Sequence, residues 1–283
     1  MSGSILVTGG TGRLGRLVVA GLKARNADFR VLTRDPVAAA DVLGPGVALQ
    51  RGDLAGAALD DVGQVFLLSP IAPDIVALQT GLIGRAHAAG VGRILKLSGS
   101  DWSMTAPGAS WSGDAHRDIE GALRATDLAL RPSAWTQTAL GQMVAQLRDG
   151  DSFTSSRGPV AYIDIRDIAD TAVALLLADR WPSGPMVLTG PRAIDRDGLA
   201  ALAAEITGRP ITGVALSLAV QAEQLRAGGA TAFVQRYAGD FARLMQAGAA
   251  AAMTGTVSAV LGRPARDVAD YLRPALQAGG TNG

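Results

Sequence analysis

Few side chains in this 283-residue sequence are suited to acid–base chemistry. It contains no cysteine, two lysines (Lys23 and Lys96) and two histidines (His87 and His116) that lie far apart. Disulfides, thiolate catalysis and Cys-based metal sites are therefore excluded, and no metal site is predicted. His116 is the best candidate for a proton donor, because an imidazole has an ordinary pKa of about 6.5. The competing interpretation is a structural or ribose-binding hydrogen bond.

Lys96 and Ser98 lie at the end of an apolar segment, residues 93–97, that predicts a buried strand. A lysine inside such a strand needs a partner, for which Glu120 or a carboxylate elsewhere in the chain is a candidate. A structural ion pair competes here with a catalytic role. Ser98 follows the strand and is placed to hydrogen-bond a cofactor amide or a substrate oxygen. The catalytic candidates are therefore Lys96, Ser98 and His116.

Three tryptophans are candidates for contact with a flat apolar substrate. Trp102 and Trp111 lie in an irregular segment, residues 101–113, directly after the strand that ends at Leu97. Trp135 follows the next strand along the chain. The alternative role for each ring is packing within the protein core.

A glycine-rich stretch opens the chain and predicts a strand, a tight turn and a helix. Such a turn directs backbone N–H groups at a helix N-terminus toward a phosphate. Gly9 suits the tight turn, Gly12 a close approach of the backbone to a pyrophosphate, and Gly15 close packing of the helix on the sheet. Gly9, Gly12 and Gly15 fit the pattern G-x-x-G-x-x-G, whereas Gly10, Gly12 and Gly15 fit G-x-G-x-x-G. Spacing alone does not choose between these two assignments.

The end of the second strand, residues 29–33, bears on the choice between NAD and NADP. Thr33 closes this strand and Arg34 follows, so Arg34 and Arg13 are placed to bind a 2′-phosphate through their planar guanidinium groups. NADP(H) is the preferred cofactor. The alternatives are Asp35 as acceptor for the ribose of NAD(H), and Arg34 as a solvated surface residue.

Asp53 follows the third strand and is placed to accept a hydrogen bond from an adenine amino group, with Leu54 packed on the adenine face. Capping of a short helix around residues 57–59 is the alternative role for Asp53, and both roles are compatible.

The order of expected elements predicts an α/β fold, a Rossmann-type doubly wound parallel sheet with a smaller, mostly helical C-terminal lobe. We expect a dinucleotide-binding domain over residues 1–155, with a return to it around 156–190, and a substrate-capping lobe over residues 191–283. The last six residues are expected to fray. The expected strands are 4–7, 29–33, 47–50, 64–68, 93–97, 128–131, 185–188 and 211–216, and the expected helices include 13–25, 36–42, 74–88, 114–124 and 195–206.

Composition narrows the class of protein further. A hydrophobic content of 48% supports a sizeable core, and a net charge of +1 suggests no nucleic-acid or acidic-membrane partner. No signal peptide and no membrane-spanning segment are expected, so a cytoplasmic protein is the prediction. Monomer and homodimer both remain open.

Several motifs in ordered succession over residues 4–215 resemble the NmrA-like group of atypical short-chain dehydrogenase/reductases. His116 with Glu120 is one of them. The others occupy residues 7–15, 32–36, 52–54, 88–98, 130–132, 162–169 and 188–191. The resemblance implies an NAD(P)H-binding fold whose members include NADPH-dependent reductases of quinones, dyes and other flat conjugated compounds, as well as redox-responsive regulators.

The resemblance also implies which residues contact the cofactor. Together with the assignments above, the candidate cofactor-binding residues are Gly9, Thr11, Gly12, Arg13, Leu14, Gly15, Arg34, Asp53, Leu54, Ser69, Pro70, Ser98 and Pro132.

The chain departs from typical short-chain dehydrogenases in lacking a Tyr-x-x-x-Lys pair. Arg166, Phe241 and Ala275 stand four residues after its three tyrosines. The sequence therefore predicts an NADPH-dependent oxidoreductase that reduces a conjugated, aromatic or quinonoid small molecule, for which water or His116 is a sufficient acid. The alternatives are an NADP(H)-sensing regulatory protein without turnover and a non-redox tailoring enzyme.

Overall fold

The computed structural model of this protein describes residues 3–156 and 158–277. The expected fraying of residues 278–283 lies outside the described residues. The described chain forms two compact units and passes between them several times. The first unit contains the chain up to Gly99, together with Ala115–Arg131 and Ile168–Met186. The second contains Ser100–Asp114, Pro132–Asp167 and the described chain from Val187 onward.

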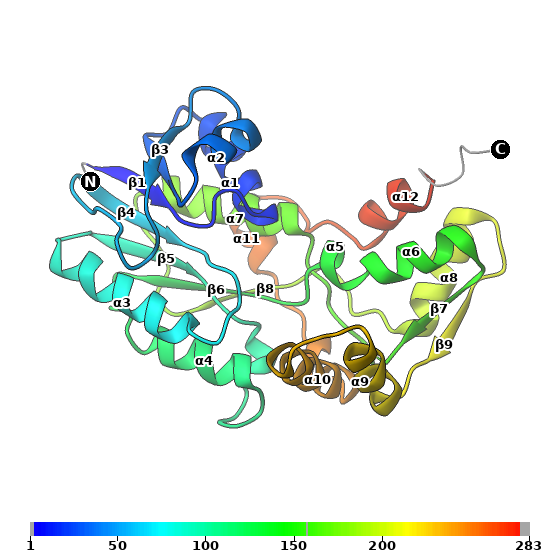
Figure 1. Cartoon of the computed structure of the whole chain (residues 1–283). Coiled ribbons are helices and arrows are strands. Elements are labelled where there is room, and N and C mark those ends of the chain that lie inside the picture. Colours follow the sequence, from blue (N-terminus) through cyan, green and yellow to red (C-terminus); the bar gives the residue numbers. More distant parts are fainter. Residues whose placement is uncertain (1–2, 157, 278–283) are drawn as a thin grey trace. The chain divides into compact units, whose positions relative to one another are not determined.

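The first unit is organised around a sheet with the strand order β3-β2-β1-β4-β5-β6-β8 (Figure 1). Its strands are β1 (Ser4–Val7), β2 (Phe29–Thr33), β3 (Ala48–Arg51), β4 (Val62–Leu67), β5 (Arg93–Leu97), β6 (Leu128–Pro132) and β8 (Met186–Leu188). The pairings from β3 through β6 are parallel. The chain winds outward in both directions from β1 and β4, so the switch point where α/β sheets bind ligands lies between these strands.

Helices cover both faces of this sheet. They are α1 (Arg13–Lys23), α2 (Pro36–Leu43), α3 (Ile75–Ala88), α4 (Trp111–Glu120) and α7 (Ile165–Leu177). Figure 1 shows α3 and α4 on one side of the strands and α1 and α7 on the other. On the latter side, Gly21 of α1 allows close contact with Val173 of α7, because a Cβ added at Gly21 would lie 2.9 Å from a methyl group of Val173.

The central strands are apolar because both of their faces are covered. Leu6, Val7, Val65 and Phe66 are fully buried. Just beyond β1, the hydroxyl of Thr8 donates to the carbonyl of Leu68 at 2.7 Å and accepts from the amide of the same residue at 2.8 Å. This double contact joins the carboxyl ends of β1 and β4 at the edge where the glycine turn begins.

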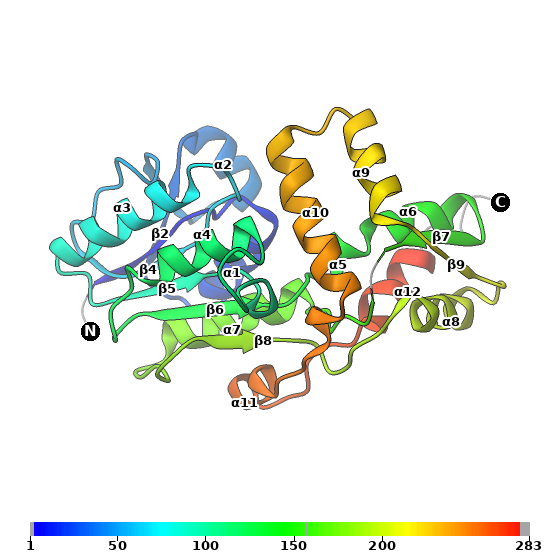
Figure 2. The same ribbon diagram turned by 90° about the horizontal axis from the view of Figure 1, so that it is seen from below.

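The second unit has its own core and a two-stranded parallel sheet. Its strands are β7 (Ser152–Ser155) and β9 (Thr212–Ala215), and its helices are η1 (Asp101–Ser103), α5 (Thr136–Ala139), α6 (Gly141–Asp149), α8 (Arg196–Thr207), α9 (Leu218–Ala227), α10 (Ala232–Gln246), η2 (Ala249–Ala251), α11 (Thr256–Leu261) and α12 (Ala269–Gln277). Helices α9 and α10 pack side by side (Figure 2). Tyr162, Phe153 and Leu272 lie at the centre of the core.

The predicted α/β fold is confirmed, and the bounds of β2 and β5 match the expected ones. Three details differ. The helix expected at 114–124 begins at Trp111 and ends at Glu120, so Arg124 lies outside it. The segment expected to be irregular, 101–113, contains η1 and the first turn of α4. The division into units also differs from the expected one, since Ser100–Asp114 and Pro132–Asp167 belong with the C-terminal residues.

Candidate functional site

The glycine turn after β1 is closely packed, and three of its glycines have no room for a Cβ. Gly9 has a φ of +63°, which favours glycine, and a Cβ there would lie 2.7 Å from the carbonyl oxygen of Leu68. A Cβ at Gly15 would lie 2.1 Å from the carbonyl oxygen of Gly9. Gly10 also lacks room, because a Cβ would meet Val31 at 2.5 Å. Packing therefore requires glycine at Gly9, Gly10 and Gly15 alike and does not choose between the two glycine spacings.

Gly12 differs from its neighbours, and this difference bears on whether a dinucleotide fits. A Cβ at Gly12 would contact only the carbonyl oxygen of Gly9, at 3.3 Å. Gly12 is also the N-cap of α1, and no side chain caps the first turn of this helix. The unfilled space beside Gly12 and the uncapped helix end form a cradle suited to a pyrophosphate. The residues present therefore fit a dinucleotide.

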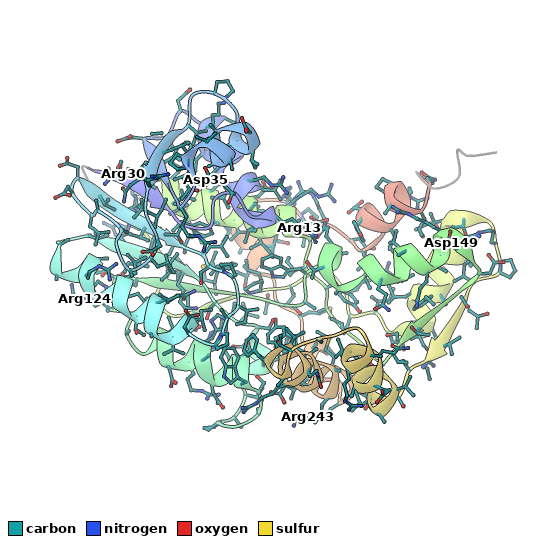
Figure 3. The ribbon with its side chains drawn as sticks, in the orientation of Figure 1. Arg13, Arg30, Asp35, Arg124, Asp149 and Arg243 are labelled. Carbon is teal, nitrogen blue, oxygen red and sulfur yellow. The ribbon has the colours of Figure 1, made fainter. Side chains whose placement is uncertain are left out.

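The end of β2 presents one arginine and one carboxylate with different roles. Asp35 is the N-cap of α2, and its Oδ1 accepts from the amides of Val37 at 3.0 Å and Ala38 at 3.1 Å (Figure 3). Arg34 is exposed and makes no hydrogen bond or ion pair within the described chain. The carboxylate is therefore engaged in capping the helix, while the guanidinium is available to a ligand. Arg13 is exposed at the first position of α1.

The remaining cofactor candidates of the first unit lie at the carboxyl ends of β3 and β4. Asp53 accepts from the amides of Ala55 at 2.9 Å and Gly56 at 2.8 Å, and so closes a turn. The helix expected after Asp53 is absent from this described segment, which forms turns instead. The hydroxyl of Ser69 accepts a hydrogen bond from the side-chain Nε2 of Gln79 at 2.8 Å. Leu54 and Ser69 are partly exposed, and Thr11 and Pro70 are exposed.

A buried polar network occupies the carboxyl end of β5, in the first unit. The ammonium group of Lys96 lies 2.9 Å from Nδ1 of His116, 3.1 Å from the hydroxyl of Ser98 and 3.3 Å from the carbonyl oxygen of Leu97. Lys96 is 0% exposed, Ser98 7% and His116 8%. His116 packs directly on the backbone of Gly99, where a Cβ would lie 2.5 Å from the imidazole ring. The structure thus brings all three catalytic candidates together.

The same network ends in a carboxylate–guanidinium pair. Ser98 donates a short hydrogen bond to Oε1 of Glu120, while Nη2 of Arg131 donates to Oε2 at 2.5 Å. Nε of Arg131 lies within 3.2 Å of both carboxylate oxygens. Glu120, a candidate partner of Lys96, therefore bonds directly to Arg131 and connects to Lys96 through Ser98. The single proton of Ser98 points to Glu120 and not to a ligand.

Burial controls the protonation of this network. It lowers the pKa of Lys96 to about 7 from an ordinary value of 10.5, an effect that the charge of Glu120 opposes and that of Arg131 reinforces. Burial, followed by the charge of Lys96, also lowers the pKa of His116 well below 6.5. His116 is therefore a neutral imidazole at neutral pH.

Sequence reasoning missed Arg131 as a member of this network. It lies in β6, which pairs with β5, and it balances the charge of Glu120. A charged residue within an otherwise apolar strand, Leu128–Pro132, is the sequence signal that points to it. The strand pairing that brings Arg131 to Glu120 is not visible in the spacing of residues along the chain.

The tryptophan candidates all belong to the second unit, as does Pro132, whose carbonyl oxygen accepts from Ser100 at 2.7 Å. Trp102 is 7% exposed, packs edge-to-face on Phe241 at 4.9 Å and donates to the hydroxyl of Ser133, so its ring is part of the core. Trp111 and Trp135 are only partly buried.

A row of aromatic rings continues from these tryptophans along α10. Trp111 packs edge-to-face on Phe233 with ring centroids 4.7 Å apart. Phe233 stacks on Tyr237, and Tyr237 contacts Phe241 at 4.7 Å. Phe233, Tyr237 and Phe241 are each partly buried, so these rings lie neither fully in the core nor fully on the surface.

Two further observations concern metals and membranes. Among residues 3–156 and 158–277, no group of three or more His, Cys, Asp or Glu side chains is arranged to hold a metal ion. No single helix of that same stretch is long and apolar enough to cross a membrane, although the bent pair Ala232–Gln246 and Ala249–Leu261 meets the length and composition criteria together.

Comparison with known proteins agrees with this geometry. The model of the NmrA-like family matches residues 1–103. An NAD(P)H azoreductase from Xenophilus azovorans is 31% identical over 278 residues, which cover 95% of this chain and 96% of that protein.

Two solved structures share the fold over nearly the whole chain. The triphenylmethane reductase of Citrobacter sp. has a TM-score of 0.84 at 18% identity, covering 97% of this chain and 99% of that one. The NADPH-dependent quinone oxidoreductase of Escherichia coli in complex with NADPH has a TM-score of 0.83 at 23% identity, covering 95% and 98%. With the glycine turn, the strand order and a relative of 31% identity along the chain, this protein belongs to the NmrA-like family and is an NAD(P)H-dependent oxidoreductase.

Proposed function

We propose that this protein uses NADPH to reduce a conjugated, aromatic or quinonoid small molecule by hydride transfer, without a Tyr-x-x-x-Lys pair. The observation that carries the proposal is the position of His116, which lies 2.9 Å from Lys96 of β5, at the same carboxyl edge of the first unit's sheet as the glycine turn. A proton donor is thereby available at the edge where α/β sheets bind a dinucleotide.

The chain's own residues supply the cofactor site in this proposal. The turn from Gly9 to Gly15 holds the pyrophosphate, and Arg34 together with Arg13 binds the 2′-phosphate that distinguishes NADPH from NADH. Asp53, Leu54, Ser69 and Pro70 contact the remainder of the dinucleotide at the neighbouring strand ends. When bound, the reduced nicotinamide supplies the hydride.

The acid–base requirement of the reaction supports the substrate class. A simple ketone needs strong assistance by an acid, whereas a quinone accepts hydride readily and leaves an anion that a mild acid protonates. An extended iminium also accepts hydride readily, and its product is neutral and needs no proton. His116 is a mild acid of this kind. Nδ1 of His116 accepts a hydrogen bond from the ammonium group of Lys96, so the ring proton is on Nε2. His116 donates this Nε2 proton to the reduced substrate.

Names of the relatives point to the same substrate class. The azoreductase, the triphenylmethane reductase and the quinone oxidoreductase are each named for a conjugated substrate. In this chain we assign Trp111 and Trp135 to stacking on such a substrate, since both rings are only partly buried. Trp102 supports them from the core of the second unit.

A titration followed by a turnover assay tests this function. The protein is titrated with NADPH and with NADH, and the loss of nicotinamide absorbance is then followed with a panel of quinones, azo dyes and triphenylmethane dyes. The proposal predicts tighter binding of NADPH and oxidation by at least one acceptor class. Tight binding without oxidation by any acceptor would favour an NADP(H) sensor, and conversion of a substrate without net NADPH consumption would favour a non-redox tailoring enzyme.

A further inference from the structure

The buried network has one consistent assignment of donors and acceptors. Arg131 donates to Glu120, and Ser98 also donates its single proton to Glu120. Ser98 can then only accept from Lys96, whose three N–H groups are directed at Ser98, the carbonyl of Leu97 and Nδ1 of His116. His116 consequently ends the chain of hydrogen bonds on the side away from Glu120 and Arg131, with its ring proton on Nε2.

The ring of His116 is almost fully enclosed. In the described part of the chain, His116 has one hydrogen bond, at Nδ1. The fully sealed polar side-chain atoms without a partner there are Gln64 Oε1, Gln79 Oε1, Arg93 Nε and Thr171 Oγ1, and Nε2 of His116 is not one of them. The residue as a whole is 8% exposed.

We propose that Lys96 is the proton source for the reaction and that His116 conducts the proton, with Glu120, Arg131 and Ser98 as positioning residues. This inference rests on the proposed function, because it concerns protonation of the reduced substrate. It extends that function by naming the group that loses the proton and by giving the ion pair of Glu120 and Arg131 a part in the reaction.

The proton movements balance as follows. The anion left on the substrate after hydride transfer forms a bond to the Nε2 proton of His116. As the Nε2–H bond breaks, Nδ1 takes a proton from the ammonium of Lys96, so the imidazole stays neutral and Lys96 becomes a neutral amine. After product leaves, a solvent proton enters at Nε2 and the Nδ1 proton returns to Lys96. The 2.9 Å contact between Lys96 and Nδ1 is retained in both states, with its donor and acceptor exchanged.

The surroundings of Lys96 favour such an exchange. The residues in register with it on β4 and β6, Leu67 and Ala129, are apolar. His116 and Glu120 face it from α4, and Arg131 from β6. Burial and the charge of Arg131 lower the pKa of Lys96, and the charge of Glu120 raises it. The resulting pKa of about 7 allows both protonation states of Lys96 near neutral pH.

Nuclear magnetic resonance of the whole protein tests the resting state without any turnover. Two lysines and two histidines give few signals, and Lys23→Met and His87→Asn identify each by elimination. The proposal predicts that Lys96 titrates within about one unit of pH 7 and that His116 is the neutral Nε2–H tautomer while Lys96 is an ammonium. A Lys96 signal that keeps its ammonium shift above pH 9, about two units higher than expected, or a His116 ring protonated at Nδ1 while Lys96 is an ammonium, would overturn it.

Substitution by arginine separates proton supply from positioning. In Lys96→Arg the guanidinium retains a positive donor for Nδ1 but does not release a proton, because its pKa exceeds 12. With a quinone acceptor whose protonation limits the rate, kcat is predicted to fall about 100-fold with little change in KM. The exposed Lys23→Met variant is the matched control and keeps the wild-type rate. Full activity of a folded Lys96→Arg variant would assign Lys96 a positioning role only and refute the proposal.

The pH dependence of wild-type kcat tests the relay even if the Lys96→Arg variant does not fold. Wild-type kcat should decrease as pH rises through about 7, because Lys96 then loses the proton it supplies. A kcat independent of pH across this range, for an acceptor whose protonation limits the rate, contradicts the relay. Failure of the proposed function has a different signature, namely no NADPH oxidation at all while Lys96 and His116 keep the predicted resonances.

Discussion

At the residue scale, cofactor preference depends on Arg34. This side chain is exposed and makes no hydrogen bond or ion pair within the described chain, while its neighbour Asp35 is engaged in capping α2. Arg34→Ala should weaken NADPH binding by about 10- to 100-fold, the loss expected for one or two charge-assisted hydrogen bonds. NADH affinity should change by less than about twofold, since NADH carries no 2′-phosphate.

Fluorescence titration of both cofactors measures this effect. Arg25→Ala is the matched control, because Arg25 is also an exposed arginine of the first unit and bonds only to the carbonyl of Gly21. Equal weakening of NADPH and NADH by Arg34→Ala would show that the side chain does not read the 2′-phosphate.

Lys96 gives the protein a predictable dependence of stability on pH. Its pKa is about 7 in the folded state and near 10.5 when unfolded, so the unfolded chain binds more protons between these values. The free energy of unfolding should therefore rise with pH from about 7 toward 10.5, and Lys96→Met should flatten this rise. Urea unfolding at several pH values measures the slope, and an identical slope in the variant would contradict the assignment.

At the element scale, the glycines of the turn between β1 and α1 have different roles. We expect some of them to be needed for packing of the fold and Gly12 to be needed for binding of the cofactor. Gly12→Ala adds a methyl group that meets only Gly9, at 3.3 Å. The free energy of unfolding should change by less than about 1 kcal/mol. NADPH affinity should fall by about tenfold or more, because the methyl group occupies the space through which the backbone approaches the pyrophosphate.

Alanine substitutions at two other glycines serve as controls for that experiment. Gly15→Ala should destabilise the protein whether or not NADPH is present, because its Cβ would lie 2.1 Å from the carbonyl oxygen of Gly9. Gly84→Ala, in the open middle of α3, should stabilise it by about 0.5–1 kcal/mol and leave binding unchanged. Unaltered NADPH binding by Gly12→Ala would place the pyrophosphate elsewhere.

The elements themselves were largely predictable from local pattern. Buried parallel strands such as β5 are continuous apolar runs, and a strand followed by glycines and a periodic helix is a strong local signal. The segment after Asp53 was harder, since Ala57 and its neighbours suit a helix but form turns once the carboxylate of Asp53 binds the amides of Ala55 and Gly56.

Most residues of the candidate site were predictable from the sequence, but the hydrogen bonds between them were not. Lys96, Ser98 and His116 stand out because lysine and histidine are rare in this chain. Their order in the network depends on the pairing of β5 with β6, which brings Arg131 to Glu120 and leaves Lys96 bonded to Ser98 and His116. Such partner choice is set by tertiary packing, which sequence spacing does not encode.

At the scale of the whole molecule, the chain divides its functional candidates between two units. The cofactor turn, Arg34 and the Lys96–His116 network belong to the first, and the tryptophans and the aromatic row of α10 belong to the second. The chain crosses between units at Gly99 and again after Arg131, directly beside the network. Residues that follow a strand in sequence can thus belong to the other unit, which is why the expected boundary near residue 155 differs from the observed one.

Transfer of deuterium from NADPH labelled at the nicotinamide C4 position tests the central claim most directly. The labelled cofactor is incubated with the protein and a quinone or dye that supports NADPH oxidation, and the reduced product is examined by mass spectrometry and nuclear magnetic resonance. Where the acceptor forms a new carbon–hydrogen bond, as in a triphenylmethane dye, the account predicts that the label from one face of C4 appears in that bond. Reduced product without label, formed while the cofactor keeps its deuterium, would contradict hydride transfer by this protein.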